Sequence, residues 1–145
     1  MFRNILLVFE NEEIFPEALI YAREFAMRID AKVTLLMIVP MSFAGRTAIG
    51  PKRNTIRNIE IRGGKLLSDC LKAFIQEGIE VNSALKIGEP AQELMKFLAD
   101  RPPFQSIVWG SGRDLPERGG QRHWMSRIVG NLECPLLTVS KREDR

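Results

Sequence analysis

The sequence has few of the residues that build disulfide frameworks and metal centres. Its 145 residues include two cysteines, Cys70 and Cys134, and a single histidine, His123. The cysteines do not form the C-x-x-C pair of a zinc site, and two thiols do not make a disulfide framework. We therefore expect no metal centre, and we expect the protein to work in the reducing cytoplasm.

Long hydrophobic runs are also missing. The longest, such as residues 5–9 and 35–39, are far shorter than the roughly 20 residues that cross a bilayer. Arg3 and Glu10 bracket the first of them, so we expect neither a signal peptide nor a membrane span. With 45% hydrophobic and 27% charged residues, the composition is that of a globular protein, which argues against disorder and fibrous repeats. The length predicts one domain over residues 1–145.

The net charge of +3 is small but unevenly distributed. Six basic residues lie between positions 45 and 65 against one acid, Glu60: they are Arg46, Lys52, Arg53, Arg57, Arg62 and Lys65. No aromatic residue for base stacking lies among them, so nucleic acid is an unlikely partner. A solvated helix face is the favoured interpretation, and attraction of an anionic ligand is the alternative.

Buried strands and amphipathic helices alternate along the chain. Residues 4–10 and 31–40 are continuously apolar in their centres, which is typical of strands covered on both faces in a parallel sheet. Further strands are expected at residues 80–88, 105–111 and 135–140, and helices at 16–30, 89–100 and 124–132. The last helix is expected to turn four apolar side chains inward: Met125, Ile128, Val129 and Leu132.

The remaining segment divides into a connection and a long helix. Residues 41–54 contain two glycines and a proline without a sustained period and predict a mobile connection. An apolar stripe then runs from Ile56 to Phe74 and ends near Gly78. Gly63 and Gly64 inside this helix predict either a kink or close packing. Strands joined by such helices require crossovers, so the expected fold is α/β: a Rossmann-like five-stranded parallel sheet flanked by helices on both faces.

Three stretches carry a family resemblance. "IGEPAQEL" at 87–94, "SIVWGSG" at 106–112 and "CPLLTVS" at 134–140 resemble the universal stress protein family in order, spacing and context. The opening "NILLVFENEE", the second-strand "VTLLMIVP" and the helix end "FIQEGIEV" fit it as well, so the resemblance covers essentially the whole chain. It implies an adenine nucleotide alpha hydrolase-like fold.

In the nucleotide-binding branch of that family, the resemblance implies a phosphate site just after the fourth strand. Its pattern is G-x-x-G, nine residues, then G-[ST], whose backbone amides and hydroxyl would hold phosphates. Here Gly110 matches the first glycine, whereas Gly112 comes one residue early and Arg113 takes the expected position. Arg122 and His123 stand where the G-[ST] pair would fall. The motif is degraded, which places ATP binding in doubt.

Other residues at the carboxyl ends of the strands complete the candidate site. The resemblance implies a D-x-S stretch after the first strand, where this chain has Glu10, Asn11 and Glu12. Glu10 could accept a hydrogen bond from ribose or adenine, whereas Glu12 adds negative charge near the phosphates. Val39 could contact an adenine ring.

The basic residues of the glycine loop leave a second interpretation open. Arg113, Arg118, Arg122 and His123 could bind an anion through guanidinium groups, although a solvated loop is favoured. His123 by itself is interpreted as a surface or capping residue.

Three further residues are assigned to packing. Trp109 and Trp124, which flank the loop, are expected to pack on each other rather than on a ligand. Cys70 is expected in the core, and Cys134 is the more reachable thiol.

These features predict a cytoplasmic regulatory or binding module rather than a turnover enzyme. The resemblance implies a homodimer through the last strand, with Leu136, Leu137 and Val139 at the interface. The alternative function is a sensor that binds ATP or AMP in the loop at residues 110–123. A nucleotide-hydrolysing or nucleotidyl-transfer enzyme is the weakest alternative, because only analogy of fold supports it.

Overall fold

A computed structural model describes residues 3–41, 49–112, 115 and 123–139, with the backbone alone at 49–52. Five strands form one parallel sheet in the order β3-β2-β1-β4-β5. The strands are β1 (Asn4–Glu10), β2 (Lys32–Pro40), β3 (Val81–Gly88), β4 (Ser106–Trp109) and β5 (Leu136–Leu137). The predicted five-stranded α/β fold is confirmed, and its strand order reverses between β1 and β4.

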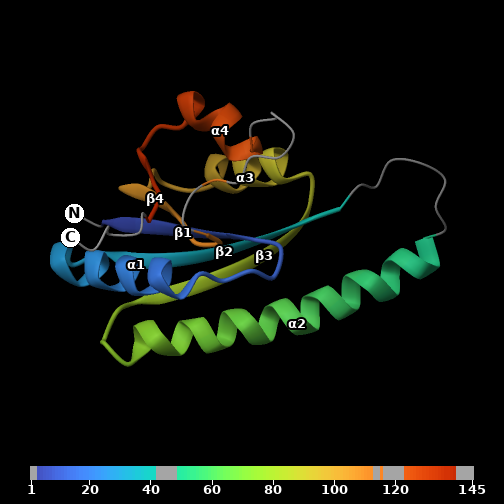
Figure 1. Ribbon diagram of the computed structural model, residues 1–145, viewed down its shortest axis with the longest axis horizontal. Coiled ribbons are helices and arrows are strands. Elements are labelled where there is room, and N and C mark those ends of the chain that lie inside the picture. Colours follow the sequence, from blue (N-terminus) through green and yellow to red (C-terminus); the bar gives the residue numbers. More distant parts are fainter. Residues whose placement is uncertain (1–2, 42–48, 113–114, 116–122, 140–145) are drawn as a thin grey trace, which may run out of the picture.

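Helices cover both faces of the sheet (Figure 1). On one face, α1 (Pro16–Ile29) and α2 (Ile49–Ile75) pack over a core that includes Phe9, Leu35 and Phe74, all fully buried. On the other face, α3 (Pro90–Ala99) and α4 (Trp124–Ile128) pack over a second core that includes Leu6, Leu94 and Trp109. Because alternate residues of β1 point to opposite faces, Glu10 shares the α3 and α4 face with Val8.

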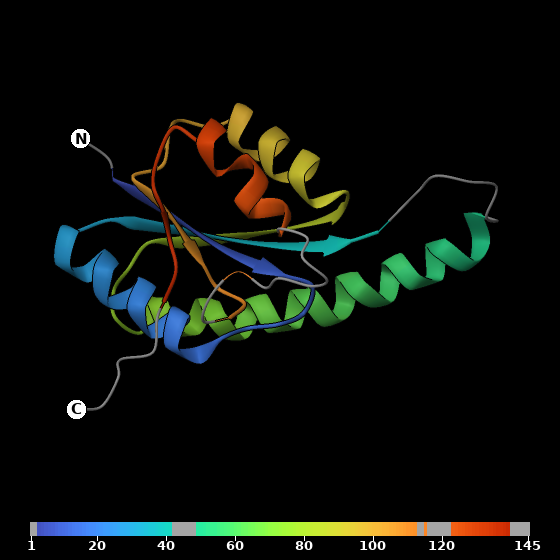
Figure 2. The same cartoon turned by 45° about the horizontal axis from the view of Figure 1, so that its top comes forward.

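Helix α2 begins earlier than the sequence predicted. Residues 49–54 were expected to belong to a connection, but they lie in the first turns of α2. Pro51 sits in the first turn, where the missing amide donor costs nothing, so it starts the helix instead of breaking it. The result is a helix that extends past the carboxyl end of β2 (Figures 1 and 2).

The two glycines within α2 behave differently. A β-carbon on Gly63 would lie 3.3 Å from atoms of both Leu85 and Met37, whereas one on Gly64 would meet nothing within 4 Å. Gly63 thus permits the close packing of α2 on β2 and β3 that the sequence left as one of two possibilities. Past the helix, Gly78 takes the left-handed conformation at φ 75°, as expected near a helix end.

The C-terminal elements are shorter than predicted. Helix α4 ends at Ile128 and continues as the 3-10 turn η1 (Val129–Asn131). The tighter turn rotates Val129 outward, where it is 41% exposed, so its predicted inward position is wrong. The last strand comprises two residues instead of six, because only Leu136 and Leu137 pair with β4. In the part of the chain that is described, no helix is long and apolar enough to cross a membrane.

Candidate functional site

The carboxylate of Glu10 is the centre of a polar cluster at the carboxyl end of the sheet. Glu10 is the last residue of β1, and its Oε1 lies 2.9 Å from Nε2 of His123. The indole Nε1 of Trp124 donates a hydrogen bond to the other carboxylate oxygen. Both partners come from the start of α4, so the cluster joins β1 to the far end of the glycine loop.

The hydrogen bonds of His123 fix the position of its proton. His123 is the N-cap of α4, and its Nδ1 accepts the backbone N–H of Met125 at 3.1 Å. Because that nitrogen acts as an acceptor, the neutral ring carries its proton on Nε2 and donates it to Glu10. The expectation that His123 is a capping residue is confirmed. The side chains of His123 and Glu10 are 7% and 22% exposed, so solvent screens this contact poorly.

Two tryptophans enclose the histidine. The ring centroids of Trp109 and Trp124 lie 6.2 Å apart in an edge-to-face arrangement, which confirms their predicted mutual packing. His123 lies 4.9 Å from Trp109 and 5.1 Å from Trp124, measured between ring centroids. The Nε1 of Trp109 is buried and has no hydrogen-bond partner among the described residues. An unpaired buried donor is uncommon and marks a place where an acceptor atom would be stabilised.

The start of the glycine loop is held by the end of β1. The N–H of Gly110 donates to the carbonyl of Val8 at 2.7 Å, and its own carbonyl accepts the N–H of Phe15 at 2.8 Å. A β-carbon on Gly110 would lie 2.7 Å from the ring of Phe9 and 2.9 Å from the Val8 oxygen. This glycine is therefore required by the close approach of two strands, a constraint that exists without any ligand.

The hydroxyl of Ser111 is also engaged. It accepts the N–H of Glu10 at 2.6 Å and donates to the carbonyl of Glu13 at 2.6 Å. Sequence reasoning missed this residue, whose contacts lie about a hundred positions away in the chain. Gly112, the next residue, is partly exposed.

A second charged contact lies beside the β1 end. Glu12 forms a bidentate ion pair with Arg62 of α2, at 2.7 and 3.1 Å. The hydrogen bond from Arg62, helped by its charge, holds the pKa of the Glu12 carboxyl below its ordinary value. The positive charge of Arg62 thus compensates the negative charge of Glu12, so Glu12 would repel a phosphate less than its sequence position suggests. No sequence signal links two residues so far apart.

The other predicted site residues do not join the Glu10 cluster. Val39 ends β2 but is 4% exposed and belongs to the core beneath α1 and α2, on the opposite face of the sheet from the Glu10 carboxylate. Arg113, Arg118 and Arg122 lie outside the described residues. Within the described ranges, no group of three or more His, Cys, Asp and Glu side chains could hold a metal ion.

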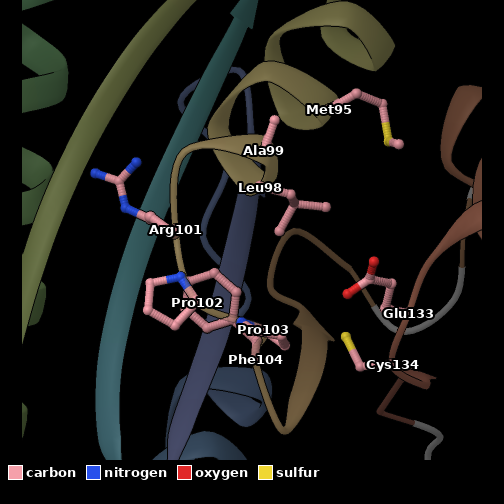
Figure 3. A pocket seen from close by; sticks show the side chains of 9 residues that line it. All are labelled: Met95, Leu98, Ala99, Arg101, Pro102, Pro103, Phe104, Glu133 and Cys134. Carbon is pink, nitrogen blue, oxygen red and sulfur yellow. The ribbon is translucent and has the colours of Figure 1, made fainter.

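A separate hollow of about 320 Å³ lies at the other end of the sheet, before β4 and β5 begin. Figure 3 shows Met95, Leu98 and Cys134 around it, with Arg101 directed away from Cys134. The Arg101 guanidinium instead covers the ring of Phe97 at 3.6 Å. Burial, and then the charge of Glu133, raise the pKa of the Cys134 thiol, so this hollow is not organised around a reactive thiolate.

Known proteins are similar to this chain in sequence and in fold. No family model matches the chain. A universal stress protein of Methanocaldococcus jannaschii is 26% identical over 143 residues, which cover 97% of this chain and 84% of that protein.

Solved structures of low sequence identity have the same fold. Universal stress protein UspA of Lactobacillus plantarum superposes with a TM-score of 0.74 at 20% identity, over 95% of this chain and 97% of its own. A universal stress protein family member of Burkholderia pseudomallei gives 0.70 at 18% identity, over 97% of both chains. An Arabidopsis thaliana family protein with AMP bound gives 0.60 at 16% identity, over 98% of this chain and 94% of its own. The chain is thus similar in sequence to a universal stress protein over nearly its whole length, and it has the fold of universal stress protein structures.

Proposed function

We propose that this chain is a single-domain, cytoplasmic regulatory module of the universal stress protein family that does not bind ATP tightly and does not turn it over. The observation that carries the proposal is the Glu10 carboxylate, which contacts Nε2 of His123 and accepts the indole N–H of Trp124. A nucleotide that used this carboxylate would have to displace both donors, and leaving them buried and unpaired costs about 1–3 kcal/mol each.

Two further contacts support weak ATP binding. The Gly110 amide, which the motif would assign to phosphate, donates to the Val8 carbonyl. The Ser111 hydroxyl is bound on both sides by backbone groups, so it does not act as a nucleophile paired with His123. These contacts favour a binding role over an enzymatic one.

The test is a nucleotide panel. Thermal unfolding would be followed with ATP, ADP and AMP at millimolar concentrations, with and without magnesium, and titration calorimetry would follow any hit. We expect no stabilisation by ATP. A ligand that bound, present at 100 times its Kd, would stabilise the fold by about 2.7 kcal/mol, which this measurement would detect. Stabilisation that is present in the natural protein and lost in Arg122→Ala would overturn the proposal.

An AMP or ATP sensor remains the second candidate. The buried Trp109 Nε1, unpaired among the described residues, favours it, because a ligand acceptor atom that reached this donor would be stabilised. The Arabidopsis relative was solved with AMP bound, and AMP requires fewer phosphate contacts than ATP. In this version Gly110, Gly112, Arg113, Arg122 and His123 would hold the phosphate. Val39 would not contact the base, because it is buried in the core on the other face of the sheet.

We also propose that the module is a homodimer through its last strand. Leu136, Leu137 and Val139 are all partly exposed, and β5 is an edge of the described sheet. An edge strand with apolar side chains needs a cover. Light scattering after size-exclusion chromatography should give twice the chain mass at micromolar concentration, and a monomer would contradict this interface.

A further inference from the structure

The other edge of the sheet carries a groove that the proposed function does not use. It has a volume of about 530 Å³ and lies between α2 and β3. The wall on α2 consists of Ile56, Glu60, Gly64 and Leu67, and the strand contributes five successive residues, 83–87. Glu93 of α3 completes the lining. Figures 1 and 2 show α2 running along the sheet on this side.

Half of the backbone N–H and C=O groups of β3 point away from β2, at the edge of the sheet. The amides of Val33 and Met41 donate to the carbonyls of Glu80 and Gly88, so even-numbered residues of β3 bond to β2. In a parallel ladder the intervening residues face the other way. The N–H and C=O groups of Val81, Ser83, Leu85 and Ile87 therefore point outward, and the described sheet has no strand beyond them.

This edge lacks the usual protection against pairing. Exposed edges are commonly short, interrupted by a bulge or proline, or lined with lysines. Strand β3 pairs with β2 in unbroken register over eight residues, from Val81 to Gly88, with no proline and a single lysine, Lys86. By contrast, β5 at the opposite edge is two residues long.

We propose that this groove binds an extended peptide segment of a partner protein, which adds to the sheet as a strand beside β3. Residues 83–87 span about 13 Å at the rise of a strand, so about five peptide residues would lie in the groove. Alternate peptide side chains would face α2, where Ile56 and Leu67 favour aliphatic residues and the Glu60 carboxylate favours Lys or Arg. Main-chain hydrogen bonds supply affinity in this mode of binding, and the side-chain pockets supply specificity.

Charge disfavours a second copy of this chain as the occupant. The groove lining contains two carboxylates, Glu60 and Glu93, and one ammonium group, Lys86. Lys86 alternates to the α3 side of the strand, so Glu60 is the only charged residue on the described α2 wall of the groove. Two copies paired by a twofold axis would place like charges together, whereas a basic peptide would complement them.

The probe is the fluorescein-labelled peptide Thr-Val-Thr-Lys-Thr-Val-Thr, which carries its two Val residues and its Lys on one face. Its pattern is the same in either strand direction. Anisotropy should show saturable binding to the full chain, and amide NMR shifts should concentrate at Val81, Ser83, Leu85 and Ile87. The matched control is the same peptide N-methylated at alternate residues, which keeps its side chains but loses its ladder donors. We expect the control to bind about tenfold more weakly or worse.

Two protein variants separate groove binding from other effects. Gly64→Leu fills the groove at a position where a β-carbon meets nothing within 4 Å, so the fold should tolerate it while binding falls about tenfold. Ser68→Leu introduces the same side chain at an exposed position of α2 outside the groove and should leave binding unchanged. Ser83→Pro removes one outward N–H without touching the β2 ladder and should also weaken binding.

Three results would overturn the proposal. These are an absence of binding by the probe peptide, equal binding by the N-methylated control, and dimerisation of the natural protein through the β3 amides, which would leave no room for the peptide. None of these results depends on the nucleotide panel, because Glu10 and His123 do not line the groove.

Discussion

Oε1 of Glu10 and Nε2 of His123 lie 2.9 Å apart and join the end of β1 to the start of α4. The histidine serves both elements at once, because its other ring nitrogen caps the helix through the Met125 amide. One side chain therefore connects the carboxyl end of the sheet to the helix that leads into β5. The single histidine of the chain is a structural connector here.

His123→Ala should lower the free energy of unfolding by about 1–3 kcal/mol, because it removes both the helix cap and the imidazole contact to the Glu10 carboxylate. Urea unfolding followed by tryptophan fluorescence measures this, since Trp109 and Trp124 both lie near the ring. His123→Asn is the matched control, because asparagine caps a helix well but does not reproduce the imidazole contact. If alanine and asparagine cost the same, the cap contributes nothing. If neither substitution lowers the free energy of unfolding, the contact between Glu10 and His123 does not stabilise the fold.

Gly110→Ala should be destabilising by about 1–3 kcal/mol, the usual cost of overpacking. The added carbon would lie 2.7 Å from the Phe9 ring and 2.9 Å from the Val8 carbonyl oxygen, and the latter cannot move without disturbing the sheet. Denaturant midpoints measure the change. Gly130→Ala serves as control, because a β-carbon there meets nothing within 4 Å. Equal stability of the two variants would show that β1 and β4 can separate at this point.

The sequence predicted the sheet and its helices because their signals are local. The apolar centres of β1 and β2 and the spacing of Ala18, Ala22 and Ala26 in α1 can be recognised within one element, and all three alanines are buried. The predicted core position of Cys70 is confirmed for the same reason. Boundaries were harder to predict, because the extent of β5 is set by its pairing with β4, which includes only Leu136 and Leu137, and no local pattern records that.

The site was predicted only in its location. Glu10, Gly110 and His123 could be assigned to one end of the sheet from their place after buried strands. Their partners could not be assigned, because the Glu10 contacts are 113 and 114 residues away in the chain. A glycine required by strand packing and a glycine required by phosphate look identical in a sequence. Only the distance from Gly110 to Phe9 reveals the packing requirement.

The Glu12–Arg62 ion pair should make part of the stability pH-dependent. The folded-state pKa of Glu12 lies below its ordinary value of 4.5, so the contribution is complete above that value and is lost as the pH falls through the folded-state pKa. Arg62→Gln should therefore lower the urea midpoint at pH 7. The difference in midpoint between this variant and the natural protein should become smaller towards pH 3.

Arg57→Gln is the matched control for that series. It removes the same charge from the exposed face of α2, where the described residues offer Arg57 no ion pair. The difference in urea midpoint between Arg57→Gln and the natural protein should not become smaller as the pH falls. Parallel curves for the two variants would mean that the Arg62 contact contributes nothing in solution.

The two thiols should differ in reactivity. Burial, and then the charge of Asp69, raise the pKa of the Cys70 thiol to about 11, so about 0.1% of it is thiolate at pH 8. Cys134 is partly exposed, although its pKa is also raised. Alkylation by iodoacetamide at pH 8, followed by mass spectrometry, should label Cys134 first and Cys70 only as the fold opens. In urea the two sites should react at similar rates. Native Cys70 that reacts as fast as Cys134 would show that α2 separates from the sheet far more readily than its buried stripe implies.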